Sequence, residues 1–214
     1  MNASLTDAQR EKFFVRVVAS RRCFGYTFSI SNILMKREES AMWKTTLIVL
    51  VVLFLTGVTF ADETVIKVHQ VSEQGIGKEI GTITASDSKY GLILTPHLGD
   101  LTPGLHGFHV HEKPDCSHAM KEGKSVPALA AGGHYDPAAT GKHEGPYGNG
   151  HLGDLPPLYV AADGKASLPV LAPRLKVADI KGRSFMIHAG GDNYSDMPAP
   201  LGGGGARVAC GVVK

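Results

Sequence analysis

The sequence has little that could anchor it in a membrane. Its candidate span, Thr45–Phe60, has 16 residues and includes Thr and Gly, whereas a spanning helix needs roughly 20 apolar residues. A short basic stretch precedes this run, and the small residues Thr59 and Ala61 stand just before Asp62. These features are typical of a cleaved secretory signal. We therefore predict a signal peptide at residues 42–61 rather than an anchor, and no stable membrane insertion after cleavage.

Residues 1–41 lack a place in this organisation. A signal peptide normally begins a chain, yet a polar stretch of 41 residues precedes this one. We predict that translation begins at Met35 or Met42, and that residues 1–41 are an upstream leader assigned by mistake. The mature chain would then run over residues 62–214, which is an ordinary length for one domain.

The mature part also lacks an excess of positive charge. The full chain has a formal net charge of +2, but residues 1–61 hold 8 of its 22 Lys and Arg and only 4 of its 20 Asp and Glu. Residues 62–214 therefore carry a formal charge of −2. This balance gives no case for binding to nucleic acid.

Cysteine is scarce, with three residues in the chain. Cys23 lies in the leader, which leaves Cys116 and Cys210 in the mature part. An even pair of cysteines in an exported protein favours a disulfide bond. A free, reduced pair is the alternative.

Helical patterning is missing from residues 62–214, where no convincing amphipathic helix occurs. Short runs of alternating apolar and polar residues are present instead, and seven or eight such strands predict an antiparallel sandwich or barrel. Two irregular stretches, Lys113–Pro157 and Gly190–Ala206, predict long loops that are either functional or disordered. The expected strands are Thr64–Val71, Glu79–Ala85, Gly91–Thr95, Leu105–Glu112, Leu158–Asp163, Gly164–Ala172, Ser184–Gly190 and Arg207–Val213.

Histidine, in contrast, is concentrated. Six of the ten histidines lie within Gly107–Asp154, a segment rich in Gly and Pro. Residues two apart on a strand lie on one face, so His109 and His111 would point the same way, with Val110 opposite. Imidazole nitrogen suits zinc and copper, whereas calcium and magnesium need sites rich in oxygen. The pattern predicts a metal site.

The other histidines differ in how well they fit such a site. His143, His151 and Asp154 share one Gly-rich segment and form a set that needs one more ligand to complete a tetrahedron. His134 lies between this set and the strand pair, and His188 stands alone in a late strand. Four further histidines have no motif partner and are predicted not to be ligands: His69, His97, His106 and His118.

Four motifs occur in order along the chain: GFHVHE, AGGHYDP, GKHEGPYGNGHLGDLP and GGGGARVACGVV. Together they resemble the copper/zinc superoxide dismutases of the bacterial periplasmic kind, and the resemblance covers about Val65–Lys214. It implies an all-β Greek-key antiparallel β-barrel, or flattened sandwich, of about eight strands with two long metal-site loops. It also implies one copper ion and one zinc ion per subunit, and a location in the periplasm.

The resemblance implies a role for each motif residue. Copper would be held by four histidines, which are His109, His111, His134 and His188. Zinc would be held by His134, His143, His151 and Asp154. The imidazole of His134 would therefore bridge the two metals and would also carry a proton in the reaction.

Four residues outside the ligand sets are also implied. Asp192 would link a copper histidine to a zinc histidine. Arg207 would guide superoxide, and Cys116 and Cys210 would form the family's intrachain disulfide. In a loop of about 94 residues, such a bond stabilises the fold by roughly 4–5 kcal/mol in the chain-entropy model.

The chain departs from the intracellular members of this family in one respect. The segment that forms a charged guide in those enzymes is here Gly190–Ala206, and its charges are all acidic. Electrostatic steering of the substrate would have to come from elsewhere. Lys113, Lys121 and Lys124 are candidates, and an ordinary solvated surface is an equal alternative for these lysines.

The predicted function is the dismutation of superoxide, which would protect the cell envelope. A non-catalytic copper/zinc carrier or chaperone domain of the same fold is the alternative, but it would be expected to have lost copper ligands or Arg207. A zinc hydrolase would need a general-base carboxylate, as in HExxH, and the sequence has no such motif. The strands do not distinguish a monomer from a homodimer.

Overall fold

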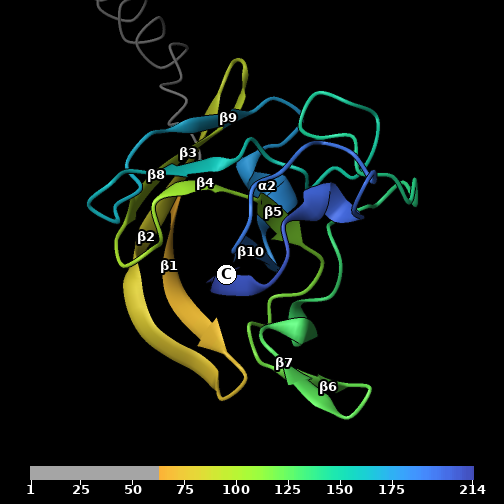
Figure 1. Ribbon diagram of the computed structural model, residues 1–214. Coiled ribbons are helices and arrows are strands. Elements are labelled where there is room, and N and C mark those ends of the chain that lie inside the picture. The colour runs from red at the N-terminus through yellow and green to blue at the C-terminus, as the bar shows by residue number, and fades with distance from the viewer. Residues whose placement is uncertain (1–62) are drawn as a thin grey trace, which may run out of the picture. The chain divides into compact units, whose positions relative to one another are not determined.

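The computed structural model describes residues 63–214 (Figure 1). The predictions for the leader, residues 1–41, and for the signal peptide, residues 42–61, lie outside the described residues. Within residues 63–214, no helix combines the length and the apolar character that crossing a bilayer requires.

Strands dominate the described part of the chain, as predicted. Residues 63–214 contain a seven-stranded antiparallel sheet in the order β5-β10-β11-β1-β2-β3-β9 and two separate strand pairs. The sheet consists of β1 (Glu63–Ser72), β2 (Gly75–Ser88), β3 (Gly91–Leu98), β5 (Phe108–His111), β9 (Val170–Ala172), β10 (Arg183–His188) and β11 (Arg207–Val213). The pairs are β4 (Gly104–His106) with β8 (Leu158–Val160), and β6 (Ala119–Lys121) with β7 (Lys124–Val126). Helical structure is limited to α2 (Val177–Ile180), η3 (Leu129–Ala131) and η4 (Leu201–Gly203) within the same residues.

Strands that are distant in the sequence lie side by side in the curled sheet (Figure 1). β5 pairs with β10, and β1 pairs with both β2 and the C-terminal strand β11. Such crossovers distinguish a Greek-key arrangement from a simple meander. The predicted all-β Greek-key fold is therefore confirmed.

Alternation along the strands separates the apolar core from the histidines. Phe108 and Val110 of β5 are fully buried in the main hydrophobic core, where Phe108 stacks on Phe185 of β10 with ring centroids 5.4 Å apart. Burial of each such side chain stabilises the fold by about 1.5–3 kcal/mol. Because successive side chains alternate between faces, His109 and His111 point away from this core, as predicted.

One expected strand, Leu105–Glu112, is divided in the structure. β4 pairs with β8, whereas β5 pairs with β10, so the chain must change partners between them. The break falls at Gly107, whose amide donates to the carbonyl oxygen of Gly190 at 2.7 Å. The alternation of apolar and polar residues changes phase at this point, since Leu105 is followed by Phe108 and Val110 as the next apolar residues. This change of phase is the sequence signal of the break, which the prediction of one continuous strand missed.

A second expected strand, Gly164–Ala172, is shorter than predicted. Only Val170–Ala172 forms β9, which pairs with β3 at the sheet edge. Pro169 precedes it and cannot donate a ladder hydrogen bond. The preceding residues instead make a single bridge, between Ala166 and Leu98.

The long loop after β5 is tied to the barrel by a disulfide. Cys116 and Cys210 are joined, with their Cα atoms 5.8 Å apart and a sequence separation of 94. Both half-cystines are buried in a small second core with Ala128, Ala131 and Met186. The bond therefore attaches the loop to β11, a few residues from Arg207.

Candidate metal centre

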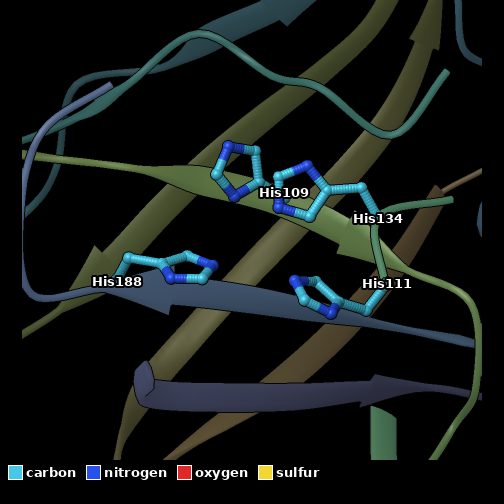
Figure 2. Close-up of side chains that lie close together, drawn as sticks. All are labelled: His109, His111, His134 and His188. Atoms are coloured by element: carbon cyan, nitrogen blue, oxygen red, sulfur yellow. The ribbon is translucent and has the colours of Figure 1, made fainter. Parts of the chain in front are cut away.

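Four imidazole rings face one another outside the main core (Figure 2). His109 and His111 come from β5, His188 comes from the end of β10, and His134 comes from the loop between β7 and β8. One ring nitrogen from each lies within 4.8 Å of the others, and all four residues are buried. Of these four rings, those of His109 and His134 are closest together, with centroids 3.9 Å apart.

Backbone pairing brings the loop residues to β5. His134 forms an isolated antiparallel bridge with His111, and Asp154 forms one with His109. Between these bridges, the amide of Val110 donates to the carbonyl oxygen of Gly153 at 2.8 Å, and its carbonyl accepts from the amide of Tyr135 at 2.8 Å. Two parts of the irregular loop are therefore held beside β5 much as a neighbouring strand would be.

A second group of potential ligands adjoins the first: ligand atoms of His109, His134, His143 and Asp154 lie within 4.8 Å of one another, and His151 lies at the edge of this group. The Oδ1 atom of Asp154 lies 3.0 Å from His134 Nδ1, 3.0 Å from His143 Nδ1 and 3.4 Å from His151 Nδ1. Three imidazole nitrogens thus converge on one buried carboxylate oxygen. A set of three nitrogens and one carboxylate is a donor set that zinc accepts.

Within residues 63–214, six buried ring nitrogens have no hydrogen-bond partner. A buried polar atom left unpaired costs about 1–3 kcal/mol, and so many in one place call for a ligand. Metal ions would satisfy all of them. The atoms are His109 Nδ1, His111 Nε2, His134 Nε2, His143 Nδ1, His151 Nδ1 and His188 Nε2.

In His111 and His188, the other ring nitrogen is hydrogen-bonded to the backbone. His111 Nδ1 donates to the carbonyl oxygen of Gly132 at 2.9 Å, and His188 Nδ1 donates to that of Gly205 at 3.1 Å. Donation from one nitrogen leaves a lone pair on the other, so each ring presents its unpaired nitrogen as a metal ligand.

Asp192 holds one histidine of each group. Its Oδ2 accepts from His109 Nε2 at 2.7 Å, and its Oδ1 accepts from His143 Nε2 at 2.8 Å. The backbone amide of Tyr194 also donates to Oδ1 at 2.8 Å. This carboxylate therefore links the two groups through the nitrogens that face away from the ligand space.

The four rings of the first group are neutral. Burial, together with repulsion from neighbouring imidazoles, lowers the pKa of His109 to about 3 and that of His188 to about 4. Burial likewise lowers the pKa of His111 and of His134. Neutral imidazole is the form that binds metals, so this pocket is ready to accept a cation without releasing protons.

The second group is more polar. Burial opposes charge on His143, but the facing carboxylates of Asp154 and Asp192 outweigh it and raise the pKa of His143 to about 9. Burial would raise the pKa of both carboxyls, yet the facing histidines hold the pKa of Asp154 and of Asp192 below the usual range. Two carboxylates thus remain ionised in a buried site.

Arg207 lies beside this centre, paired with His188 across β10 and β11. Its Nη1 donates to Ala128 O at 2.5 Å, and its Nη2 donates to Gly132 O at 2.7 Å. Burial lowers the pKa of Arg207 from its usual value, but a guanidinium remains charged near neutral pH. The same Gly132 oxygen accepts from His111 Nδ1. One carbonyl oxygen therefore holds both the Arg207 guanidinium and the His111 ring.

The glycines of the GGGG motif have a steric role that the sequence does not reveal. A Cβ atom on Gly202, where φ is +71°, would lie 2.1 Å from Asp192 Oδ1 and 2.7 Å from His143 Nε2. A Cβ atom on Gly204 would lie 3.2 Å from the Cγ atom of His188. The absence of side chains therefore lets this loop lie directly on the histidines and their carboxylate.

The four histidines without motif partners lie outside both ligand groups. His106 is buried, with Nδ1 2.6 Å from the carbonyl oxygen of His188 and Nε2 2.8 Å from that of Thr102. His69 is half-buried, and His97 and His118 are exposed.

The barrel and the two adjoining groups of potential ligands define a β-barrel metalloprotein. A family model described as copper/zinc superoxide dismutase (SODC) matches residues 79–213. The chain belongs to the copper/zinc superoxide dismutase family.

Relatives with high identity cover most of this chain. A Cu-Zn superoxide dismutase 1 from Salmonella typhimurium is 60% identical over 151 residues, which are 70% of this chain and 85% of that protein. A Cu-Zn superoxide dismutase from Brucella abortus biovar 1 is 58% identical over 156 residues, or 72% of this chain and 90% of that protein.

Two solved structures are also similar. The Cu/Zn superoxide dismutase from Brucella abortus has 57% identity and a TM-score of 0.71, covering 72% of this chain and 100% of that one. The monomeric copper, zinc superoxide dismutase from Salmonella enterica has 55% identity and a TM-score of 0.66, with the same coverage.

The contact between Gly202 and the Asp192 bridge yields a first prediction. Gly202→Ala should lower the free energy of unfolding of the metal-free protein by about 2–4 kcal/mol, because strain at positive φ adds to a clash with Asp192. Urea unfolding followed by circular dichroism measures the change.

Gly203→Ala is the matched control, since φ is +73° there and the nearest atom to a Cβ would be Ala199 Cβ at 3.8 Å. Its free energy of unfolding should fall by only about 1 kcal/mol, from the backbone strain alone. Equal losses in the two variants would contradict the role of the Asp192 contact.

Proposed function

We propose that this protein catalyses the dismutation of superoxide, in which two superoxide anions and two protons give dioxygen and hydrogen peroxide. The observation that carries the proposal is the set of six unpaired buried ring nitrogens, which lie in and beside two clusters of potential metal ligands that have His109 and His134 in common. Membership of the copper/zinc superoxide dismutase family supports it.

The donor atoms suit two different metals. The first group offers neutral nitrogens only, which suits copper: His109 Nδ1, His111 Nε2, His134 Nε2 and His188 Nε2. The second group adds a carboxylate and suits a four-coordinate zinc ion: His134 Nδ1, His143 Nδ1, His151 Nδ1 and Asp154 Oδ1. We assign one copper ion and one zinc ion to each subunit on this basis.

Each remaining residue of the site has a defined task. Copper, when bound, supplies the one-electron oxidation and reduction that the reaction requires. Arg207 provides a fixed cation that attracts and orients the superoxide anion. His134 has one nitrogen in each group, so it can hold a proton at Nε2 while Nδ1 stays with Asp154. Asp192 keeps His109 and His143 in place through their outer nitrogens.

The two rivals fit the site less well. A carrier or chaperone domain needs neither Arg207 nor a complete copper set, and both are present here. A zinc hydrolase needs an open zinc position with a general-base carboxylate, whereas the carboxylate at the second group, Asp154, already faces three imidazole nitrogens.

Export is part of the proposal. We assign residues 42–61 to a cleaved signal peptide, residues 62–214 to the dismutase domain and the mature protein to the periplasm, with residues 1–41 as a misassigned leader. The sequence allows a homodimer, and the relative from Salmonella enterica is described as monomeric. Hydrodynamic size distinguishes the two states.

The export proposal predicts the first residue of the mature protein. N-terminal sequencing of protein recovered from the periplasm should find Asp62, because the small residues Thr59 and Ala61 mark the cleavage site. Recovery of any residue before Met35 would contradict the assigned start.

The proposed activity predicts that both metals and superoxide consumption occur together in the purified mature protein. His134→Ala should reduce superoxide consumption at least about 100-fold, because it removes the shared ligand and the proton carrier. His97→Ala changes an exposed histidine and serves as the control with full activity.

Metal content and superoxide consumption are measured on the same samples. Zinc without copper, or both metals without turnover, would contradict the enzyme assignment. Turnover that persisted in His134→Ala with both metals bound would exclude the bridging role of that histidine.

The loop after β5 is proposed to steer the substrate. Lys113, Lys121 and Lys124 are exposed there, whereas the loop between β10 and β11 carries only acidic charges before Arg207. Replacing the three lysines by Gln should lower kcat/KM about tenfold at low ionic strength. The difference should vanish near 1 M salt, where the Debye length is about 3 Å.

A control removes the same charge outside this loop. Lys67, Lys78 and Lys165 lie in exposed ion pairs with acidic residues, and their triple Gln variant should keep kcat/KM close to the original. Equal effects of the two triple variants would show that only net charge matters.

A further inference from the structure

The segment between two of the proposed zinc ligands has little structure of its own. Residues 145–150, between His143 and His151, form turns and bends without a helix or strand. Few bonds hold it locally: Asn149 N donates to a carboxylate oxygen of Glu144 at 3.0 Å, and Gly145 N donates to Asp154 Oδ2 at 3.2 Å. Beside it, His151 N donates to Lys142 O at 2.9 Å. Such a segment needs an outside support to keep one conformation.

Arg174 supplies this support with four hydrogen bonds. Its Nε donates to Pro146 O at 3.0 Å, and its Nη1 donates to Gly150 O at 3.1 Å. Its Nη2 donates to Gly145 O at 3.1 Å and to His151 O at 2.5 Å. A single planar guanidinium thus joins both ends of the segment and the backbone of a proposed ligand.

The base of Arg174 is rigid. Arg174 lies two residues after the end of β9, between Ala172 and Leu175, which are buried in the main hydrophobic core. The amide of Leu175 also donates to the carbonyl oxygen of Ala172 at 3.3 Å. The guanidinium therefore reaches the segment from a fixed part of the barrel.

His151 depends on this support more than the other ligands do. Its Nδ1 lies 3.4 Å from Asp154 Oδ1, against 3.0 Å for both His134 and His143. Its side chain is also the most exposed of the three, at 10%. Packing holds its side chain less firmly, so its position depends more on its backbone bonds, which are the one from His151 N to Lys142 O and the one that Arg174 donates to His151 O.

We propose that Arg174 is a positioning residue for the zinc group, holding residues 145–151 in the ligand-binding conformation before the metal arrives. A preorganised site avoids the entropy of ordering the segment at the moment of binding, so its affinity is higher. The inference rests on the proposed zinc site. Four of the five N–H donors of Arg174 are taken by carbonyl oxygens of this segment, which distinguishes its role from that of a guide for the substrate.

The test compares zinc affinity in the mature, disulfide-bonded protein with Arg174→Met and Arg174→Lys. Competition with a chelator measures affinity, and the visible spectrum of Co²⁺ bound in place of zinc reports the ligand geometry. Arg174→Met should bind zinc about 10–100-fold more weakly, as replacement of residues that orient metal ligands commonly does. The zinc affinity of Arg174→Lys should lie between those of the original protein and Arg174→Met. An ammonium group keeps the positive charge but cannot make the planar set of hydrogen bonds that a guanidinium makes.

Lys176→Met is the matched control. It removes a positive charge two residues further along, where the side chain donates to Ser88 O on a different part of the barrel. Its zinc affinity should equal that of the original protein. Hydrogen exchange of the metal-free Arg174→Met variant should be faster at residues 145–151 and unchanged in β1 and β10, which a general loss of stability would not produce.

The outcomes separate the two proposals. If the original protein bound no zinc, the zinc assignment itself would fail. If the original protein bound zinc and Arg174→Met bound it equally well, only the role of Arg174 would be overturned. If Arg174→Met did not fold, Arg174→Lys would test the proposal instead. A zinc affinity of Arg174→Lys equal to that of the original protein would show that the four bonds to carbonyl oxygens are not needed.

Discussion

The buried carboxylate of Asp192 is the interaction on which the metal centre depends. Its two oxygens accept from His109 and His143, and in both pairs the side chains are fully inaccessible to solvent. Burial of a charge without partners is very unfavourable, so Asp192 is stable there only while both histidines face it. The Asp192 carboxylate therefore joins the two ligand groups by hydrogen bonds without any metal. Gly202 has no side chain, so it leaves room for this carboxylate.

The barrel supplies the rigid side of this arrangement. Alternation in β5 buries Phe108 and Val110 in the core, which directs His109 and His111 to the other face. Bridges from His134 and Asp154 to β5 then attach the loop. The disulfide and the bonds from Arg207 to Ala128 O and Gly132 O attach the rest of it to β11. Regular strands orient three of the seven candidate ligands, His109, His111 and His188, and backbone bridges and individual side chains order the other four.

Much of this was predictable from local patterns. The all-β class follows from alternation and from turn residues, and the common face of His109 and His111 follows from the two-residue period of a strand. Grouping of His143, His151 and Asp154 on one Gly-rich segment indicated a metal site without any structure. The break at Gly107 was missed although the sequence carries a signal of it: the apolar positions shift in phase between Leu105 and Phe108.

The sequence by itself determined the strands, the family and the residue types available as ligands, since these depend on short-range periodicity and on motifs. Only the tertiary structure decided which nitrogen of each ring is unpaired, that Asp192 spans both groups, and that Arg174 supports residues 145–151. Those contacts join segments up to 83 residues apart, and many use backbone carbonyls that every residue possesses. No residue type marks such an acceptor, so its role exists only once the chain has folded.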